Sequence, residues 1–239
     1  MWIRSGYEYG ELVKEDCEGA AMKGGEGRAC GDNRKGGEIV LLDLACEKDH
    51  LSRYEFVHPV RQTLQRAGCN CRVMHYTDFR IDDAEGCGVI LCGTALMDNG
   101  YAENLSAFSW LADFRGPALG ICAGMQVIAA VYGGGIVSQP AIGLERIEIL
   151  EPSPLLGEPR AIEGYMLHNY AASLPEGFSL LAGCAGAAQA FRHKSRPIYG
   201  IIFHPEVRNR WILEGFACRL AHNRQGPSDE TDLCNESSQ

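Results

Sequence analysis

One stretch restricts the fold more than any other part of the chain: residues 117–126 read PALGICAGMQ. An apolar run ends in Gly-x-Cys-x-Gly, and a helix-like segment follows over residues 123–131. We interpret this as a buried strand, a tight turn that carries a thiol, and a helix, because small flanking residues let such a turn close. Cys122 would then lie at the carboxyl edge of a sheet and at a helix N-terminus, where the dipole favours a thiolate. A buried structural cysteine is the alternative for this motif taken alone.

A second motif supplies a base for this thiol, because residues 198–206 read IYGIIFHPE, an apolar strand followed by His-Pro-Glu. Pro205 favours an extended backbone at His204, and side chains two positions apart on an extended segment point the same way. Glu206 can therefore hold one ring nitrogen of His204 while the other nitrogen faces Cys122. A nucleophile, a base and a group that orients the base are thus all present.

Further apolar runs predict the rest of the fold. Strands are expected at residues 38–44, 71–76 and 88–92, and the first is a continuous apolar run, typical of a strand buried on both faces. Helices are expected at residues 54–67, 103–113, 123–131 and 209–222. This alternation predicts an α/β fold: a doubly wound, mostly parallel sheet (flavodoxin-like) with helices on both faces. Added antiparallel strands are expected at residues 144–150, 187–191 and 197–203.

Composition excludes several classes of function. The 239 residues carry a net charge of −9, which argues against a surface for nucleic acid or an anionic membrane. No apolar run is long enough to span a bilayer and no signal peptide is apparent, so we expect a cytoplasmic protein whose 11 cysteines are reduced. Cys69 and Cys71 lie too close together for a zinc knuckle, so we expect no metal and no cofactor.

The chain divides into three parts. Residues 1–36 are Gly-rich with weak periodicity, and we expect an N-terminal extension that is partly disordered or laid on the surface. Residues 37–223 carry all the strand and helix patterns and form one domain with its own core. Residues 224–239 are a polar C-terminal tail.

The two motifs, GICAGMQ at residues 120–126 and FHPE at 203–206, resemble those of the class I (triad) glutamine amidotransferases. The resemblance implies that residues 37–223 are a glutamine amidotransferase domain with Cys122, His204 and Glu206 as its catalytic triad. In that family the cysteine attacks the side-chain amide of glutamine, forms a glutamyl thioester, and releases ammonia for a synthase. Because no synthase domain is apparent, the resemblance implies that the partner is a separate synthase subunit.

The resemblance also implies an oxyanion hole and a substrate pocket. By position, the backbone N–H groups of Thr94 and Ala123 would form the oxyanion hole. The loop at Thr94 lacks the second glycine and the proline that are usual in the family. Gln126 is expected to contact the bound glutamine, and the backbone at Asn169 and Tyr170 is expected to hold its α-carboxylate and amine.

Other functions remain open from the sequence. For His168, a structural hydrogen-bonding role is favoured over direct chemistry. A stand-alone γ-glutamyl hydrolase of the same superfamily would use an identical triad. A non-catalytic redox sensor on the same fold would use only the reactive thiol, and the intact His-Pro-Glu motif argues against it.

Overall fold

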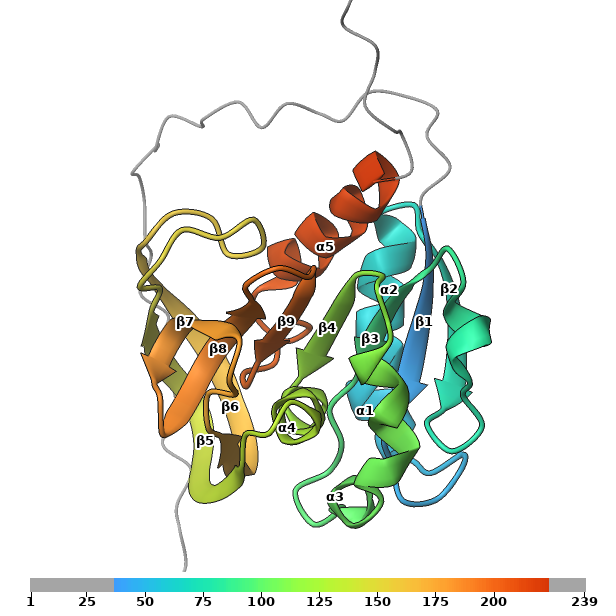
Figure 1. The fold of residues 1–239 in the computed structure, drawn as a ribbon, viewed down its shortest axis with the longest axis horizontal. Helices are drawn as coiled ribbons and strands as arrows, with labels where there is room; N and C mark the ends of the chain where they lie inside the picture. Colours follow the sequence, from blue (N-terminus) through green and yellow to red (C-terminus); the bar gives the residue numbers. More distant parts are fainter. Residues whose placement is uncertain (1–36, 224–239) are drawn as a thin grey trace, which may run out of the picture. The chain divides into compact units, whose positions relative to one another are not determined.

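A computed structural model describes residues 37–223, so the expected extension at 1–36 and tail at 224–239 lie outside the described residues. One sheet organises this part of the chain, with strand order β2-β1-β3-β4-β9-β8-β6-β5 and with β7 paired to β8 (Figure 1). The parallel strands are β1 (Glu38–Asp43), β2 (Asn70–His75), β3 (Gly88–Leu91), β4 (Ala118–Ile121) and β9 (Ile198–Ile201). The antiparallel strands are β5 (Ile136–Glu148), β6 (Ala161–Ala172), β7 (Phe178–Cys184) and β8 (Ala187–His193).

The parallel half has the strand order of a flavodoxin-like sheet, as the alternating strand and helix patterns predict. Strands β3, β4 and β9 are buried along their whole length, which explains their continuous apolar sequence. The expected hairpin is confirmed, because β8 and β9 pair antiparallel with Phe191 opposite Gly200. Strand β9 thus joins the two halves of the sheet, parallel to β4 on one side and antiparallel to β8 on the other.

Helices pack on the sheet in two groups: α2 with α5, and α4 with the 3-10 helix η2. The helices are α1 (Ser52–Phe56), α2 (His58–Arg66), η1 (Ile81–Ala84), α3 (Gly100–Glu103), η2 (Leu105–Ala112), α4 (Ala123–Val131) and α5 (Arg210–Asn223). Residues 123–129 of α4 are all buried, as expected of a helix that is apolar on every side. Of the helices within 37–223, none combines the length and the hydropathy that a bilayer crossing needs.

Three elements differ from the sequence-based expectation. The single helix expected over residues 54–67 is two helices, because Pro59 has no N–H to continue the hydrogen-bond ladder past Val57. The helix expected over residues 103–113 is the short helix α3 followed by 3-10 helix η2, whose buried residues Phe108 and Leu111 follow a three-residue period.

The strand expected over residues 144–150 is the end of a much longer strand, β5 (Ile136–Glu148). The register between β5 and β6 shifts between Ser138 and Ala141. Pro140 lies inside this irregularity and cannot donate a ladder hydrogen bond, which is why the first part of β5 does not read as a regular strand.

Candidate active site

The elbow at Cys122 joins β4 to α4 and has an unusual backbone. Cys122 has φ 50° and ψ −107°, a positive φ that an L-residue adopts only where its surroundings enforce it. Glycines make the turn possible: a Cβ at Gly120 would lie 2.5 Å from the Gly124 carbonyl carbon, and one at Gly124 only 2.1 Å from the Leu91 carbonyl oxygen. The Cys122 N–H donates to the Ile201 carbonyl at 2.9 Å, which ties the elbow to β9.

A buried histidine–glutamate pair follows β9. The Nδ1 atom of His204 lies 2.7 Å from Oε1 of Glu206, and the two residues are 1% and 3% exposed. The His204 N–H donates to the Tyr165 carbonyl at 2.9 Å, so β6 also fixes the backbone at this position. The structure therefore places His204 and Glu206 as the His-Pro-Glu motif predicts, with one ring nitrogen held by the carboxylate.

The electrostatics of His204 favour the imidazolium. Burial alone would lower the pKa of His204, but its interactions with the Cys122 thiol and the Glu206 carboxylate outweigh burial and raise the pKa to about 10. Its Nε2 atom is buried without a hydrogen bond of normal geometry and is the nitrogen left for Cys122. At neutral pH the ring therefore carries a proton that it can give to a leaving group.

Phe56 and Gly93 lie against the imidazole ring of His204. The ring of Phe56 lies 5.5 Å from that of His204, centroid to centroid. Gly93 lies close to both His204 and Cys122, because a Cβ at this position would come 2.9 Å from Cε1 of His204 and 3.5 Å from Cβ of Cys122. Gly93 belongs to the loop at Thr94 that the sequence analysis assigned to the oxyanion hole, whereas Phe56 was not singled out as part of the site.

The expected oxyanion donors lie beside the sulfur. Thr94 and Ala123 line one cavity together with Cys122. Neither backbone N–H donates to another group within residues 37–223, so both are free to meet a developing oxyanion. The Thr94 hydroxyl donates to Asp98 at 3.1 Å, and the same carboxylate accepts from the Cys46 N–H at 2.9 Å. Asp98 thus fixes the loop that lacks the usual glycine and proline.

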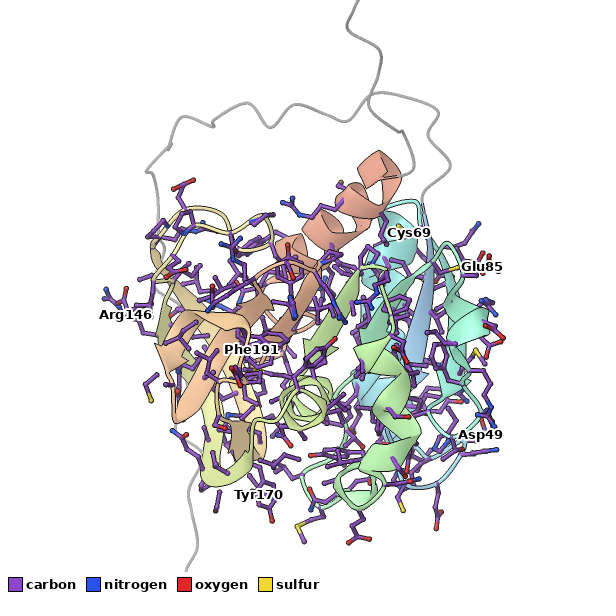
Figure 2. The ribbon with its side chains drawn as sticks, in the orientation of Figure 1. Asp49, Cys69, Glu85, Arg146, Tyr170 and Phe191 are labelled. Atoms are coloured by element: carbon purple, nitrogen blue, oxygen red, sulfur yellow. The ribbon has the colours of Figure 1, made fainter. Side chains whose placement is uncertain are left out.

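The expected substrate residues Gln126, Asn169 and Tyr170 line the same cavity. Tyr170 lies near the end of β6 (Figure 2). The Asn169 amide donates to the Leu96 carbonyl at 2.9 Å, which ties β6 to the loop after β3. The Gln126 amide already makes two hydrogen bonds, one of them to Tyr101, a residue that no sequence pattern marked.

His168 lies in the wall of this cavity, 5% exposed, with its Nδ1 atom buried and without a hydrogen-bond partner. Burial lowers the pKa of His168, backbone groups at Gln139 and Tyr170 oppose that shift, and the nearby His204 lowers the pKa further. The ring is therefore neutral at neutral pH. The residue before His168 also contacts the site, because the Cys122 thiol donates to the Leu167 carbonyl at 3.6 Å.

The cavity at Cys122 is narrow, about 10 Å³, which is room for about one water molecule. Larger hollows lie elsewhere, such as one of about 530 Å³ lined by Glu38, Cys87 and Pro117 at the opposite ends of the parallel strands. That hollow contains none of the groups described above. Among residues 37–223 no cluster of His, Cys, Asp and Glu is arranged to hold a metal ion.

Fold and site together define a flavodoxin-like α/β protein in which a nucleophile elbow presents a cysteine beside a histidine–glutamate pair. The family model for class-I glutamine amidotransferases matches residues 52–211. The chain belongs to this family and is a glutamine amidotransferase.

The proteins similar to this chain include subunits of GMP synthase. The glutamine-hydrolysing GMP synthase subunit of Thermococcus kodakarensis is 34% identical over 161 residues, covering 64% of this chain and 85% of that protein. The corresponding subunit of Pyrococcus furiosus is 32% identical over 176 residues, 68% of this chain and 92% of that protein. The crystal structure of a GMP synthase subunit from Thermoplasma acidophilum has a TM-score of 0.69 and 27% identity, covering 80% of this chain and 96% of that one.

Proposed function

We propose that Cys122, His204 and Glu206 form the catalytic triad of this amidotransferase. The observation that carries the proposal is the strained elbow at Cys122 beside a buried His204 whose far nitrogen is held by Glu206 at 2.7 Å. Such strain persists only where the surrounding structure enforces it, and it gathers at functional sites. A merely structural cysteine needs neither the strained turn nor an oriented base.

The chemistry proceeds in two halves. The Cys122 thiolate attacks the side-chain amide carbon of glutamine, and the negative charge that forms on the amide oxygen is stabilised by the N–H groups of Thr94 and Ala123. The His204 imidazolium gives its proton to the amide nitrogen, and the carbon–nitrogen bond breaks. Ammonia departs, and a γ-glutamyl thioester remains on Cys122. A water molecule then attacks the thioester while His204 takes its proton, and glutamate and the Cys122 thiolate are released.

Glu206 acts through His204. Its carboxylate accepts a hydrogen bond from the Nδ1–H of the ring, so that Nε2 is the nitrogen that gives and takes the proton. It also stabilises the imidazolium that each half-reaction needs. Gln126 and the backbone at Asn169 and Tyr170 form the pocket for the glutamine backbone groups in this proposal.

We propose that the ammonia passes to a separate synthase subunit, and that this synthase makes GMP, because the relatives are glutamine-hydrolysing GMP synthase subunits. The narrow cavity at Cys122 supports a partner role, since glutamine cannot enter a space of about 10 Å³ until the loop at Thr94 or strand β6 moves. The cytoplasm is the proposed location, because thiols such as Cys122 stay reduced there.

The test is the release of glutamate from glutamine by the full chain, with Cys122→Ser as the control. We expect release by the unmodified chain, accelerated by the synthase subunit, and none by Cys122→Ser. Release that persists in Cys122→Ser would overturn the assignment of the nucleophile. No release by the unmodified chain, even with its synthase present, would overturn the proposed reaction.

A further inference from the structure

Three residues from separate elements form one hydrogen-bond chain in the wall of the cavity. The hydroxyl of Tyr101 on α3 donates to Oε1 of Gln126 on α4 at 2.5 Å. The Nε2 of the same amide donates to the carbonyl of Tyr170 on β6 at 2.7 Å. All three residues line the cavity that contains Cys122.

The chemistry of the partners fixes the direction of both hydrogen bonds. A backbone carbonyl only accepts, so the amide must present its NH₂ group to Tyr170. The amide oxygen then faces Tyr101, whose hydroxyl must donate. Burial raises the pKa of Tyr101, and the nearby Cys122 and Asp98 raise it further, so this hydroxyl keeps its proton over the working range of pH.

Tyr101 and Gln126 are only 3% and 2% exposed, so their hydrogen bond is sheltered from bulk water. The Tyr101 hydroxyl and the Tyr170 carbonyl together determine which end of the Gln126 amide faces β6. Of the two Nε2 hydrogens, one is used by Tyr170, and the other remains for a ligand in the cavity.

We propose that Tyr101 is a positioning residue for glutamine binding, acting through the amide of Gln126. It holds the free N–H of Gln126 toward the bound glutamine and holds the backbone at Tyr170 in place. This inference rests on the proposed function of Cys122, since it assigns the wall of that same pocket. It adds a residue from α3, an element that contributes no group to the triad.

Tyr101→Phe tests the inference, because it keeps the ring and its packing and removes only the hydroxyl. Tyr132→Phe is the control: its hydroxyl donates to the Leu111 carbonyl at 2.8 Å and accepts from Nη1 of Arg196 at 3.1 Å, and Tyr132 does not line the cavity. We expect Tyr101→Phe to raise KM for glutamine about tenfold, from the loss of one buried hydrogen bond, with kcat within about twofold of the unmodified chain. Tyr132→Phe should leave KM unchanged.

A purely structural role predicts another pattern. Both variants would then lower Tm, and KM would stay the same in both. An unchanged KM in Tyr101→Phe, or an equal rise in Tyr132→Phe, overturns the inference.

A second measurement does not need turnover. Cys122 is alkylated either by a chloromethyl ketone analogue of glutamine, which must bind in the pocket, or by iodoacetamide, which needs only the thiol. In Tyr101→Phe the analogue concentration that gives half the maximal rate should rise about tenfold, while the iodoacetamide rate stays unchanged. Saturation at the same concentration in both proteins overturns the role of Tyr101. Absence of saturation in the unmodified chain counts instead against the proposed function.

Discussion

Gly93→Ala gives the sharpest test of how the site is assembled. The new Cβ would lie 2.9 Å from Cε1 of His204 and 3.3 Å from Cδ1 of Phe56. Carbon atoms pack best at roughly 3.5–4.0 Å, so the imidazole must move by roughly 0.6–1.1 Å. It cannot do so freely, because Glu206 holds Nδ1 at 2.7 Å and Phe56 packs against the ring.

Two magnitudes follow from this displacement. Overpacking of a buried site costs roughly 1–3 kcal/mol, which lowers the Tm of a domain of this size by roughly 2–12 °C. A displacement of about 1 Å of a catalytic group costs about 10²-fold in rate, equivalent to about 2.7 kcal/mol in the activation barrier. We therefore expect a folded protein with a modestly lower Tm and a kcat about 100-fold lower.

The assay is steady-state glutamate release together with a thermal melt, and Gly215→Ala is the matched control. Gly215 lies within α5, where an added Cβ meets no atom within 4 Å. In that helix the change should stabilise the protein by about 0.5–1 kcal/mol and leave kcat unchanged. A Gly93→Ala variant with kcat within about threefold of the unmodified chain would refute the reasoning about His204.

Two further predictions concern the base and the elbow. Glu206→Gln should lower kcat by about 10²–10⁴, because the neutral amide no longer stabilises the imidazolium, and glutamate release from pH 6 to 10 measures this. In the unmodified chain the folded pKa of His204 is raised from 6.5 to about 10, so its contribution to stability is complete below pH 6.5 and is lost as the pH rises toward 10. Urea unfolding should show that the free energy of unfolding falls more between pH 6 and pH 10 in the unmodified chain than in Glu206→Gln. An equal fall in both proteins would contradict this origin of the pKa shift. Gly124→Ala places a Cβ 2.1 Å from the Leu91 carbonyl oxygen and should prevent folding, which circular dichroism would show; a native melt would count against the elbow geometry.

The fold was predictable where the information is local. Residues 118–121 and 198–201 are continuous apolar runs bounded by turn residues, and such runs form buried strands in almost any α/β context. The elbow helix at 123–131 was also readable, because glycines at 133–135 end it and Gly133 adopts the φ of 83° that such a stop requires.

Prediction failed where the structure has short helices or a 3-10 helix in place of one long α-helix. Pro59 is tolerated in the first turn of a helix, and the sequence does not say whether that helix begins at residue 52 or 58. For residues 105–112, the choice of a 3-10 helix depends on how η2 packs against α4, which the local apolar pattern does not contain.

The same limit applies to the site. Cys122, His204 and Glu206 lie in motifs whose spacing carries chemical meaning, and the structure brings them together. Their catalytic roles, and those of Thr94, Ala123 and the substrate residues, stay predictions. The place of Tyr101 in the site could not be predicted from the sequence, because its position beside Gln126 depends on tertiary packing between α3 and α4.

The place of β9 between the two halves of the sheet determines how far apart Cys122 and His204 lie. Cys122 and His204 follow neighbouring strands, with Ile121 paired to Ile201 and the Cys122 N–H bound to the Ile201 carbonyl. The backbone spacing of Cys122 and His204 is therefore set by two strands that are buried along their whole length. Strand β6 adds one further contact, from the His204 N–H to the Tyr165 carbonyl, so a change in how β6 pairs with β5 would also reach the spacing of Cys122 and His204.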